Sequence, residues 1–148
     1  MKKQIISLIF IFSLGLNIHA QSANNIQIQD LISLGYPLIY ELEVSEDLTL
    51  SITYRNISNA TILFVSFVIE RNNNGNIVRT LARIDRNNAA NASANSRWQL
   101  PQSTDLSKPI NVVEIIVSIN GERDVRRYNE FQARHMLSKS GYSQGLYK

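Results

Sequence analysis

The stretch from Leu48 to Ile84, LTLSITYRNISNATILFVSFVIERNNNGNIVRTLARI, decides the fold class of this chain. Its first part alternates between apolar and hydroxyl-bearing side chains, and the apolar set is Leu48, Leu50, Ile52 and Tyr54. Because successive side chains of a strand point to opposite faces, this alternation predicts a half-buried strand. The next run, Ile62–Ile69, is apolar on both faces apart from Ser66. It predicts a central strand, or one whose outer face meets a partner or a second copy of the chain.

Two Asn-Gly pairs mark expected hairpins, because both residue types tolerate the positive φ of a primed two-residue turn. Asn74-Gly75 separates Ile62–Ile69 from Ile77–Ile84. In the latter run, inward alternation of Val78, Thr80, Ala82 and Ile84 leaves Arg79 and Arg83 outward, with Leu81 between them. The second pair, Asn120-Gly121, predicts that residues 123–128 return alongside the strand that precedes it.

The remaining strand signals are shorter. Val112–Ile119 carries a strict apolar stripe, which consists of Val113, Ile115, Val117 and Ile119. Trp98 and Leu100 share one face of a short strand, and Leu38–Val44 and Ile26–Ile32 are two earlier candidates. The stretch Arg86–Arg97, which precedes Trp98, is almost entirely Asn, Ala and Ser, and this composition predicts a long flexible surface loop.

These short strands, with turn signals between them and no long helical pattern, predict an antiparallel β-sandwich for residues 21–128. Residues 129–148 are expected to form a short helix and a flexible tail. Asn129 is a suitable N-cap for a helix from Glu130 to about Lys139, with Phe131 and Met136 as its apolar stripe.

The first 20 residues predict a cleavable signal peptide and therefore an exported protein, periplasmic or extracellular. Lys2 and Lys3 form a basic start, Ile5–Leu16 is an apolar run, and Ala20 supplies a small residue at the cut. This run is shorter than the roughly 20 residues that a membrane-spanning helix needs, so no stable membrane span is expected.

Cleavage changes the interpretation of charge. Two of the 15 Lys and Arg residues leave with residues 1–20, while all 12 Asp and Glu residues remain, so the mature net charge is 13 minus 12, or +1. A nearly neutral domain gives no reason to expect a nucleic-acid partner. The charges are unevenly distributed, because acids dominate residues 30–47 and cations dominate residues 123–148. An ordinary solvated surface or a bipolar surface that docks a charged partner would explain this distribution.

The inventory of reactive side chains argues against an enzyme. After residue 20 there is one histidine, His135, and the chain has no cysteine. The sequence therefore gives no thiolate or histidine-rich metal cluster, no Cys-His pair and no Gly-x-Ser-x-Gly elbow. We expect no cofactor and no metal, and we interpret His135 as a surface residue.

Several candidate sites have simpler explanations. Glu41 and Glu43 have the spacing of paired catalytic carboxylates on one face of a strand, but solvated charges at a sheet edge explain them as well. Trp98 could form a sugar-binding platform, although its alternation with Leu100 favours a core position. Three Asn-x-Ser/Thr triplets, at Asn56, Asn59 and Asn91, are expected by chance in an Asn-rich chain.

The segment from Leu48 to Arg71 with Asn74-Gly75 resembles the B and C strands of immunoglobulin-like and fibronectin type III-like domains of secreted bacterial proteins. A narrower likeness, carried by 67–83 and 113–127, is to the periplasmic chaperones of curli assembly. The resemblance implies an all-β fold: a seven- to eight-stranded antiparallel immunoglobulin-like β-sandwich with a short C-terminal helix or tail. The cysteine–tryptophan–cysteine pattern of true immunoglobulin domains is missing.

Two function classes follow. The first is an exported, non-enzymatic protein-binding module, most concretely a chaperone or accessory factor for extracellular curli-like fibre assembly. Its protein partner, a fibre subunit in the chaperone case, would meet charged strands through a candidate set of cations: Arg79, Arg83, Arg123 and Arg127. The second is a secreted carbohydrate-binding or hydrolytic β-sandwich that uses Glu41 and Glu43 or Trp98.

Overall fold

The computed structural model describes residues 27–138, and the chain divides into two units, 1–35 and 36–148. The described part of the first unit is a helix over 27–33 that ends in a turn. A strand over Ile26–Ile32 is therefore wrong for the residues described. Ile28, Leu31 and Ile32 recur at the spacing of a helix face, and this period fits the segment better than alternation does. The expected signal peptide, 1–20, and the residues after 138 lie outside the described part.

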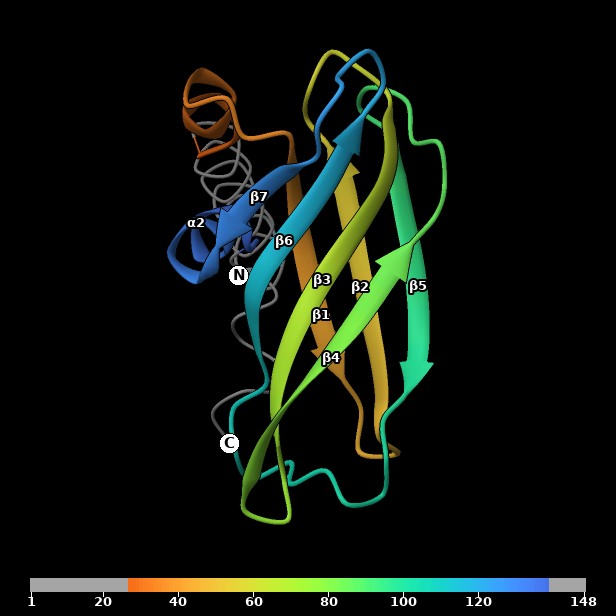
Figure 1. Cartoon of the computed structure of the whole chain (residues 1–148), viewed down its shortest axis with the longest axis vertical. Helices are drawn as coiled ribbons and strands as arrows, with labels where there is room; N and C mark the ends of the chain where they lie inside the picture. The colour runs from red at the N-terminus through yellow and green to blue at the C-terminus, as the bar shows by residue number, and fades with distance from the viewer. Residues whose placement is uncertain (1–26, 139–148) are drawn as a thin grey trace, which may run out of the picture. The chain divides into compact units, whose positions relative to one another are not determined.

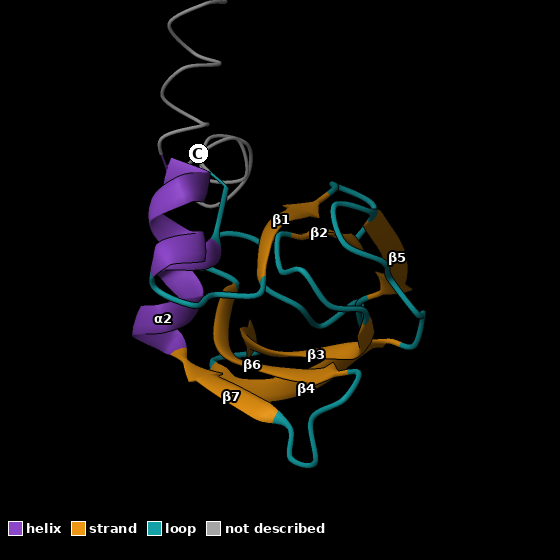
Figure 2. Cartoon of the chain, turned by 90° about the horizontal axis from the view of Figure 1, so that it is seen from above, coloured by secondary structure: helices purple, strands orange, loops and turns teal. Residues whose placement is uncertain are grey.

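The second unit is a two-layered antiparallel β-sandwich (Figures 1 and 2). One layer is a three-stranded sheet in the order β1-β2-β5, and the other is a four-stranded sheet in the order β4-β3-β6-β7. The seven strands are β1 (Leu38–Val44), β2 (Thr49–Asn56), β3 (Ile62–Asn73), β4 (Asn76–Ile84), β5 (Ser93–Gln99), β6 (Asn111–Ile119) and β7 (Arg126–Asn129). The predicted all-β class and the antiparallel sandwich are confirmed.

The core lies between the two sheets and is built from alternate positions of the strands. From the three-stranded sheet, Leu50, Ile52 and Tyr54 of β2 are buried, as their alternation predicts. From the four-stranded sheet come Val65, Phe67, Ile69, Ile115 and Val117. The layers meet through aromatic rings: Tyr40 of β1 and Phe67 of β3 have ring centroids 5.2 Å apart.

The first Asn-Gly hairpin is confirmed, and the second is confirmed in part: residues 126–128 return antiparallel to β6 as predicted, but not through a tight turn at Asn120-Gly121. Asn74 and Gly75 have φ values of 49° and 85°, as a primed turn requires, and they join β3 directly to β4. Six residues, 120–125, separate β6 from β7, and among them only Gly121 has a positive φ. The backbone N–H of Asn120 donates to the carbonyl of Thr61 at 2.8 Å, so the connection after β6 is bonded to the loop between β2 and β3.

The expected loop over Arg86–Arg97 is wrong in its second half, because β5 begins at Ser93 and pairs with β2. Ala94 is buried and Trp98 packs against the core, whereas Asn95 and Arg97 face solvent. The side chains of β5 thus alternate between the core and solvent. Because most of them are small or polar on both faces, the sequence shows no clear apolar–polar alternation. Trp98 lies opposite Leu50 on the inner face, so its expected core position is confirmed.

The apolar stripe of β6 also differs from prediction at one residue. Ile115, Val117 and Ile119 are buried, but the fourth buried position is Val112 rather than Val113. The register with β3 shifts at this point, because Val68 pairs with Glu114 and Ile69 pairs with Val112. A bulge moves a side chain to the other face, and here it turns Val113 toward the outer surface.

Helix α2 (Glu130–Met136) follows β7 directly and lies at the side of the sandwich (Figure 2). Asn129 caps it as predicted, but the helix ends at Met136 instead of near Lys139. Its buried stripe is Ala133 and Met136, whereas Phe131 is 68% exposed, so the expected stripe is confirmed at Met136 and wrong at Phe131. Beyond the helix, the N–H of Ser138 donates to the carbonyl of Tyr40 at 2.8 Å.

Candidate functional site

The solvent side of the four-stranded sheet, here called the outer face, carries the candidate site. Cross-strand pairing places its side chains in rows: Arg79 lies opposite Glu70, and Leu81 lies opposite Val68. Val68 in turn lies opposite Glu114 of β6. The outer face comprises Phe64, Val68, Glu70, Ile77, Arg79, Leu81, Arg83, Val113, Glu114, Ile116 and Arg127.

Each arginine of the outer face has an acidic neighbour. Arg79 Nε lies 3.2 Å from Glu70 Oε2, Arg83 Nε lies 2.7 Å from Asp85 Oδ1, and Arg127 Nη1 lies 2.9 Å from Glu114 Oε1. The arginine side chains remain substantially exposed in all three pairs. Because exposed ion pairs contribute only about 0 to 1 kcal/mol, a partner can replace the acids at little cost.

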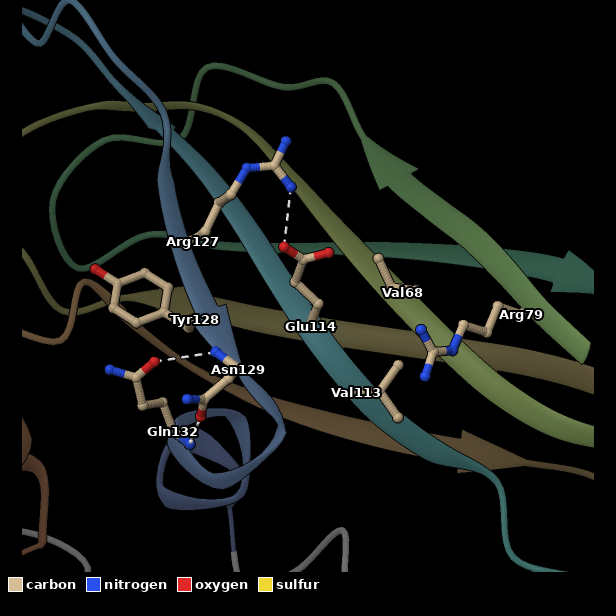
Figure 3. Close-up of a pocket in the computed structure, with 8 residues that line it drawn as sticks. All are labelled: Val68, Arg79, Val113, Glu114, Arg127, Tyr128, Asn129 and Gln132. Carbon is tan, nitrogen blue, oxygen red and sulfur yellow. Dashed lines mark hydrogen bonds and ion pairs between the residues drawn. The ribbon is translucent and has the colours of Figure 1, made fainter. Parts of the chain in front are cut away.

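An open pocket with a volume of about 400 Å³ lies in this face (Figure 3). Val68 and Val113 give it an apolar lining. Arg79 lines it from β4, while Glu114 and Arg127 line it from β6 and β7. The pocket can therefore take a group that has an apolar part and a charged or hydrogen-bonding part.

The remaining part of the pocket is fixed by the junction of β7 and α2. The side-chain oxygen of Asn129 accepts a hydrogen bond from the backbone N–H of Gln132 at 3.0 Å. In return, the Asn129 backbone N–H donates to Gln132 Oε1, also at 3.0 Å. This reciprocal capping box holds both side chains in place, so the pocket wall is preorganised (Figure 3).

The four arginines chosen from the sequence are only partly brought together. Arg79 and Arg127 both line the pocket. Arg83 lies further along β4, where its guanidinium stacks over the Phe64 ring. Arg123 is exposed in the connection 120–125 and does not line the pocket.

Arg126 was not among the chosen residues, although it is next to Arg127. It forms an ion pair with Glu122, and this hydrogen-bonded carboxylate is the main reason that the pKa of Arg126 is raised above its ordinary value. Arg126 lies opposite Val117, whereas Arg127 lies opposite Ile116 on the outer face. Strand register therefore separates two neighbouring arginines that the sequence makes equivalent.

The apolar and amide parts of the pocket were also missed. Val113 reaches the surface only because of the β6 bulge, and no sequence signal reveals this. Gln132, however, stands three residues after Asn129, which is the spacing of a capping box. That spacing could have indicated a rigid strand–helix junction.

The residues of the alternative site lie on opposite sides of one sheet. Glu41 and Glu43 pair with Thr53 and Ser51 on the solvent side of the three-stranded sheet. Trp98 pairs with Leu50 on the core side of the same sheet. One site therefore cannot use the two glutamates together with the tryptophan.

His135 is exposed on α2, as expected, within a small group of aromatic side chains. Its ring centroid lies 4.5 Å from that of Phe131, and its Nδ1 lies 3.4 Å from the hydroxyl oxygen of Tyr36. Tyr36 also packs against Tyr128, with ring centroids 5.8 Å apart. The group gives α2 an aromatic contact with the body of the sandwich.

Within residues 27–138, no three histidine or acidic side chains come together in a way that could hold a metal ion. In the same part of the chain, no helix is both long and apolar enough to cross a membrane. Comparison with known proteins gives no matching family model, no matching curated protein and no matching solved structure.

Proposed function

We propose that this chain is an exported, non-enzymatic protein-binding module that engages its partner through the outer face. In its most concrete form, it is a chaperone or accessory factor for extracellular, curli-like fibre assembly. The proposal rests chiefly on one observation. On β4, two large apolar side chains, Ile77 and Leu81, are 70% and 57% exposed and alternate with Arg79 and Arg83.

This combination is typical of interfaces rather than of inert surface. Arginine is enriched at protein interfaces, and exposed large apolar side chains that are contiguous indicate an interaction site. The outer face continues the apolar row inward through Val68, Phe64 and Ile116, which are half-buried. A partner that covers the face would bury this row and meet the arginines at its rim.

The immunoglobulin-like topology belongs to the same proposal. If the seven strands are lettered A, B, C, C′, E, F and G in chain order, the two sheets become A-B-E and C′-C-F-G. Immunoglobulin-like domains likewise place B and E in one sheet and C, F and G in the other. This strand order supports the resemblance that the sequence suggests.

Export is supported by the sequence alone, through Lys2, Lys3, the apolar run Ile5–Leu16 and Ala20. It places the module in the compartment where extracellular fibres are assembled. Mass spectrometry of protein recovered from the periplasm or medium is expected to find a chain that begins at Gln21. An uncleaved chain confined to the cytoplasm would contradict export.

The function is tested by adding substoichiometric purified protein to fibre subunits encoded beside its gene and following polymerisation by dye fluorescence. We expect a longer lag phase with the unaltered protein. The triple variant Arg79→Gln, Arg83→Gln and Arg127→Gln should lose most of the effect. The matched control is Arg55→Gln with Arg97→Gln, because these exposed arginines lie on the solvent side of the other sheet.

Unchanged kinetics with the unaltered protein would refute the fibre-assembly role. Equal loss of the effect in the triple variant and the control would refute the assignment to the outer face, because general charge would then suffice.

A further inference from the structure

Strand β4 forms an open edge of the four-stranded sheet. Its neighbour in the sheet is β3, and β4 lies at the end of the strand order (Figure 1). Among the described residues, the backbone of 76–84 makes hydrogen bonds within its ladder to β3 and to no other segment. Alternate N–H and C=O groups of an edge strand point away from the sheet, so β4 presents unpaired backbone groups.

The other edges of the sandwich are less suited to pairing. At β1, the segment after α2 already forms a parallel bridge, Tyr40 with Leu137. Strand β7 has four residues, against nine in β4. The exposed side chains of β5 are all polar, whereas β4 exposes the apolar Ile77 and Leu81.

We propose that the free edge of β4 accepts an extended segment of a partner protein as an added strand, and that this segment alternates acidic and apolar side chains on one face. The inference rests on the proposed protein-binding function and specifies how the partner is recognised. Main-chain hydrogen bonds along β4 provide the pairing, and the outward side chains of β4 select the sequence.

The chemistry of the partner follows from the side chains it would lie beside. On the outer face, β4 presents Ile77, Arg79, Leu81 and Arg83 at alternate positions. Directly opposite residues in neighbouring strands lie about 5 Å apart, so acids opposite the arginines and apolar residues opposite Ile77 and Leu81 are stabilised. The segment therefore reads apolar, acidic, apolar, acidic at every second residue.

The arginines are prepared for such a partner. The guanidinium carbon of Arg83 lies 3.7 Å from the centroid of the Phe64 ring, which restricts its motion, and its Nε shares an exposed ion pair with Asp85. Arg79 shares an exposed ion pair with Glu70. A carboxylate on the added strand can join or replace that pair with little loss.

Charge also decides between a foreign segment and a second copy of this chain. Strand β4 contains two arginines and no acid. Antiparallel pairing of two β4 strands would place four arginines on one face of adjacent strands, and like charges in that arrangement destabilise a sheet. An acidic partner segment removes this repulsion, so a foreign segment is favoured over self-association.

The test uses the full-length protein and fluorescent synthetic peptides of the length of β4. One peptide alternates Val and Glu on one face with Thr on the other, and a second replaces each Glu with Lys. Two further versions of the Glu peptide carry N-methyl groups at either set of alternate amides, which removes the hydrogen-bond donors along one edge. Binding is followed by fluorescence polarisation and by hydrogen exchange of the β4 amides.

We expect the Glu peptide to bind and to slow exchange in 76–84, while the Lys peptide does not bind. One N-methylated version should lose binding and the other should keep it, since only one edge of the peptide faces β4. Arg79→Gln with Arg83→Gln should weaken binding by about three- to tenfold. Arg97→Gln, on the edge strand β5, should leave binding unchanged.

Equal binding of both N-methylated peptides, or protection of β5 instead of β4, would overturn strand addition at β4. Failure of the Glu peptide to bind would do the same. Light scattering that shows a dimer disrupted by the β4 variants would replace the foreign segment with a second copy. If the protein still delays fibre formation in any of these cases, the proposed function stands and only this binding mode is refuted.

Discussion

The guanidinium carbon of Arg83 lies 3.7 Å from the centroid of the Phe64 ring, so a cation on the edge strand β4 rests on an aromatic side chain of its neighbour β3. Strand pairing explains the contact. Arg83 is directly opposite Ser66, and Phe64 is the next residue of β3 on the same face. The small serine leaves room for the longer side chain to lie across the ring.

This contact predicts a measurable coupling between the two residues. A double-mutant cycle with Phe64→Leu and Arg83→Gln should give a coupling of about 0.5 to 1 kcal/mol in the free energy of unfolding. The measurement is denaturant unfolding of the four proteins in the cycle. The matched pair, Phe64→Leu with Arg97→Gln, should be additive because β5 is in the other sheet. Additivity in both cycles would show that the stack contributes nothing.

Asn56 is expected to be the most sensitive polar residue of the fold. It is completely buried, its Nδ2 donates to the carbonyls of Ala60 and Asn88 at 2.7 and 2.8 Å, and its Oδ1 accepts from the backbone N–H of Ser58 at 2.9 Å. Asn56→Ala removes these three hydrogen bonds and leaves a cavity where the buried amide was, so it should lower the free energy of unfolding by about 2 to 4 kcal/mol.

Thermal and urea unfolding check this, with Asn95→Ala at an exposed position of β5 as the control. A loss for Asn56→Ala no greater than that of the control would contradict the assigned network. The same burial makes the Asn-x-Ser triplet at Asn56 inaccessible as a glycan acceptor in the folded sandwich.

Replacement of the buried Arg71 is expected to have the opposite effect, a gain in stability. The residue is 6% exposed, its Nη1 donates to Thr104 Oγ1 at 3.1 Å, and its Nε has no hydrogen-bond partner within the described structure. Arg71→Met keeps an unbranched chain and removes the unpaired buried donor, so it should raise the free energy of unfolding by about 1 to 3 kcal/mol. Arg55→Met, at an exposed site, should change it little. Clear destabilisation by Arg71→Met alone would show that the guanidinium is needed.

The turn between β1 and β2 predicts acid sensitivity. Hydrogen bonds from the Ser45 hydroxyl and the Thr49 backbone N–H lower the pKa of Asp47 below the ordinary value for an aspartate. A lowered pKa in the folded state means that the carboxylate stabilises the fold above about pH 4, and that this stabilisation is lost as the pH falls through the folded pKa. Asp105 behaves in the same way through Ser107.

The double variant Asp47→Asn with Asp105→Asn should therefore show a smaller fall in melting temperature between about pH 5 and pH 2 than the unaltered protein. Melting temperatures across this range provide the measurement, and Asp124→Asn, in the exposed connection after β6, is the control. Superimposable pH profiles for the unaltered protein and the double variant would contradict the role of these two turns.

The sequence predicts the long strands well because burial on one face imposes a period of two. The alternation of Leu50, Ile52 and Tyr54, and the pair Asn74-Gly75, are local features whose physical requirements do not depend on the rest of the chain. Composition misleads where side chains are small. Ser93, Ala94 and Asn95 form a strand because β2 offers them an edge to pair with, and nothing in their own chemistry requires it.

Alternation also predicts part of the candidate site. Outward alternation is enough to place Arg79 and Arg83 on the surface of β4, since one residue in two must face solvent. It cannot show that Arg127 comes to the same pocket as Arg79 while Arg123 does not, because that depends on the pairing of β7 with β6.

The sequence by itself determined an all-β chain, the β3–β4 hairpin, the Asn129 helix cap and a strand with outward arginines, because each follows from local backbone preference or from alternation. Tertiary structure alone decided that Val113 turns outward at a bulge, that Asn56 is buried among hydrogen bonds, that β4 is an edge strand, and that Trp98 and the β1 glutamates belong to the same sheet. These features depend on which strand pairs with which and in what register. Register is set by the packing of the whole sandwich, which no single segment encodes.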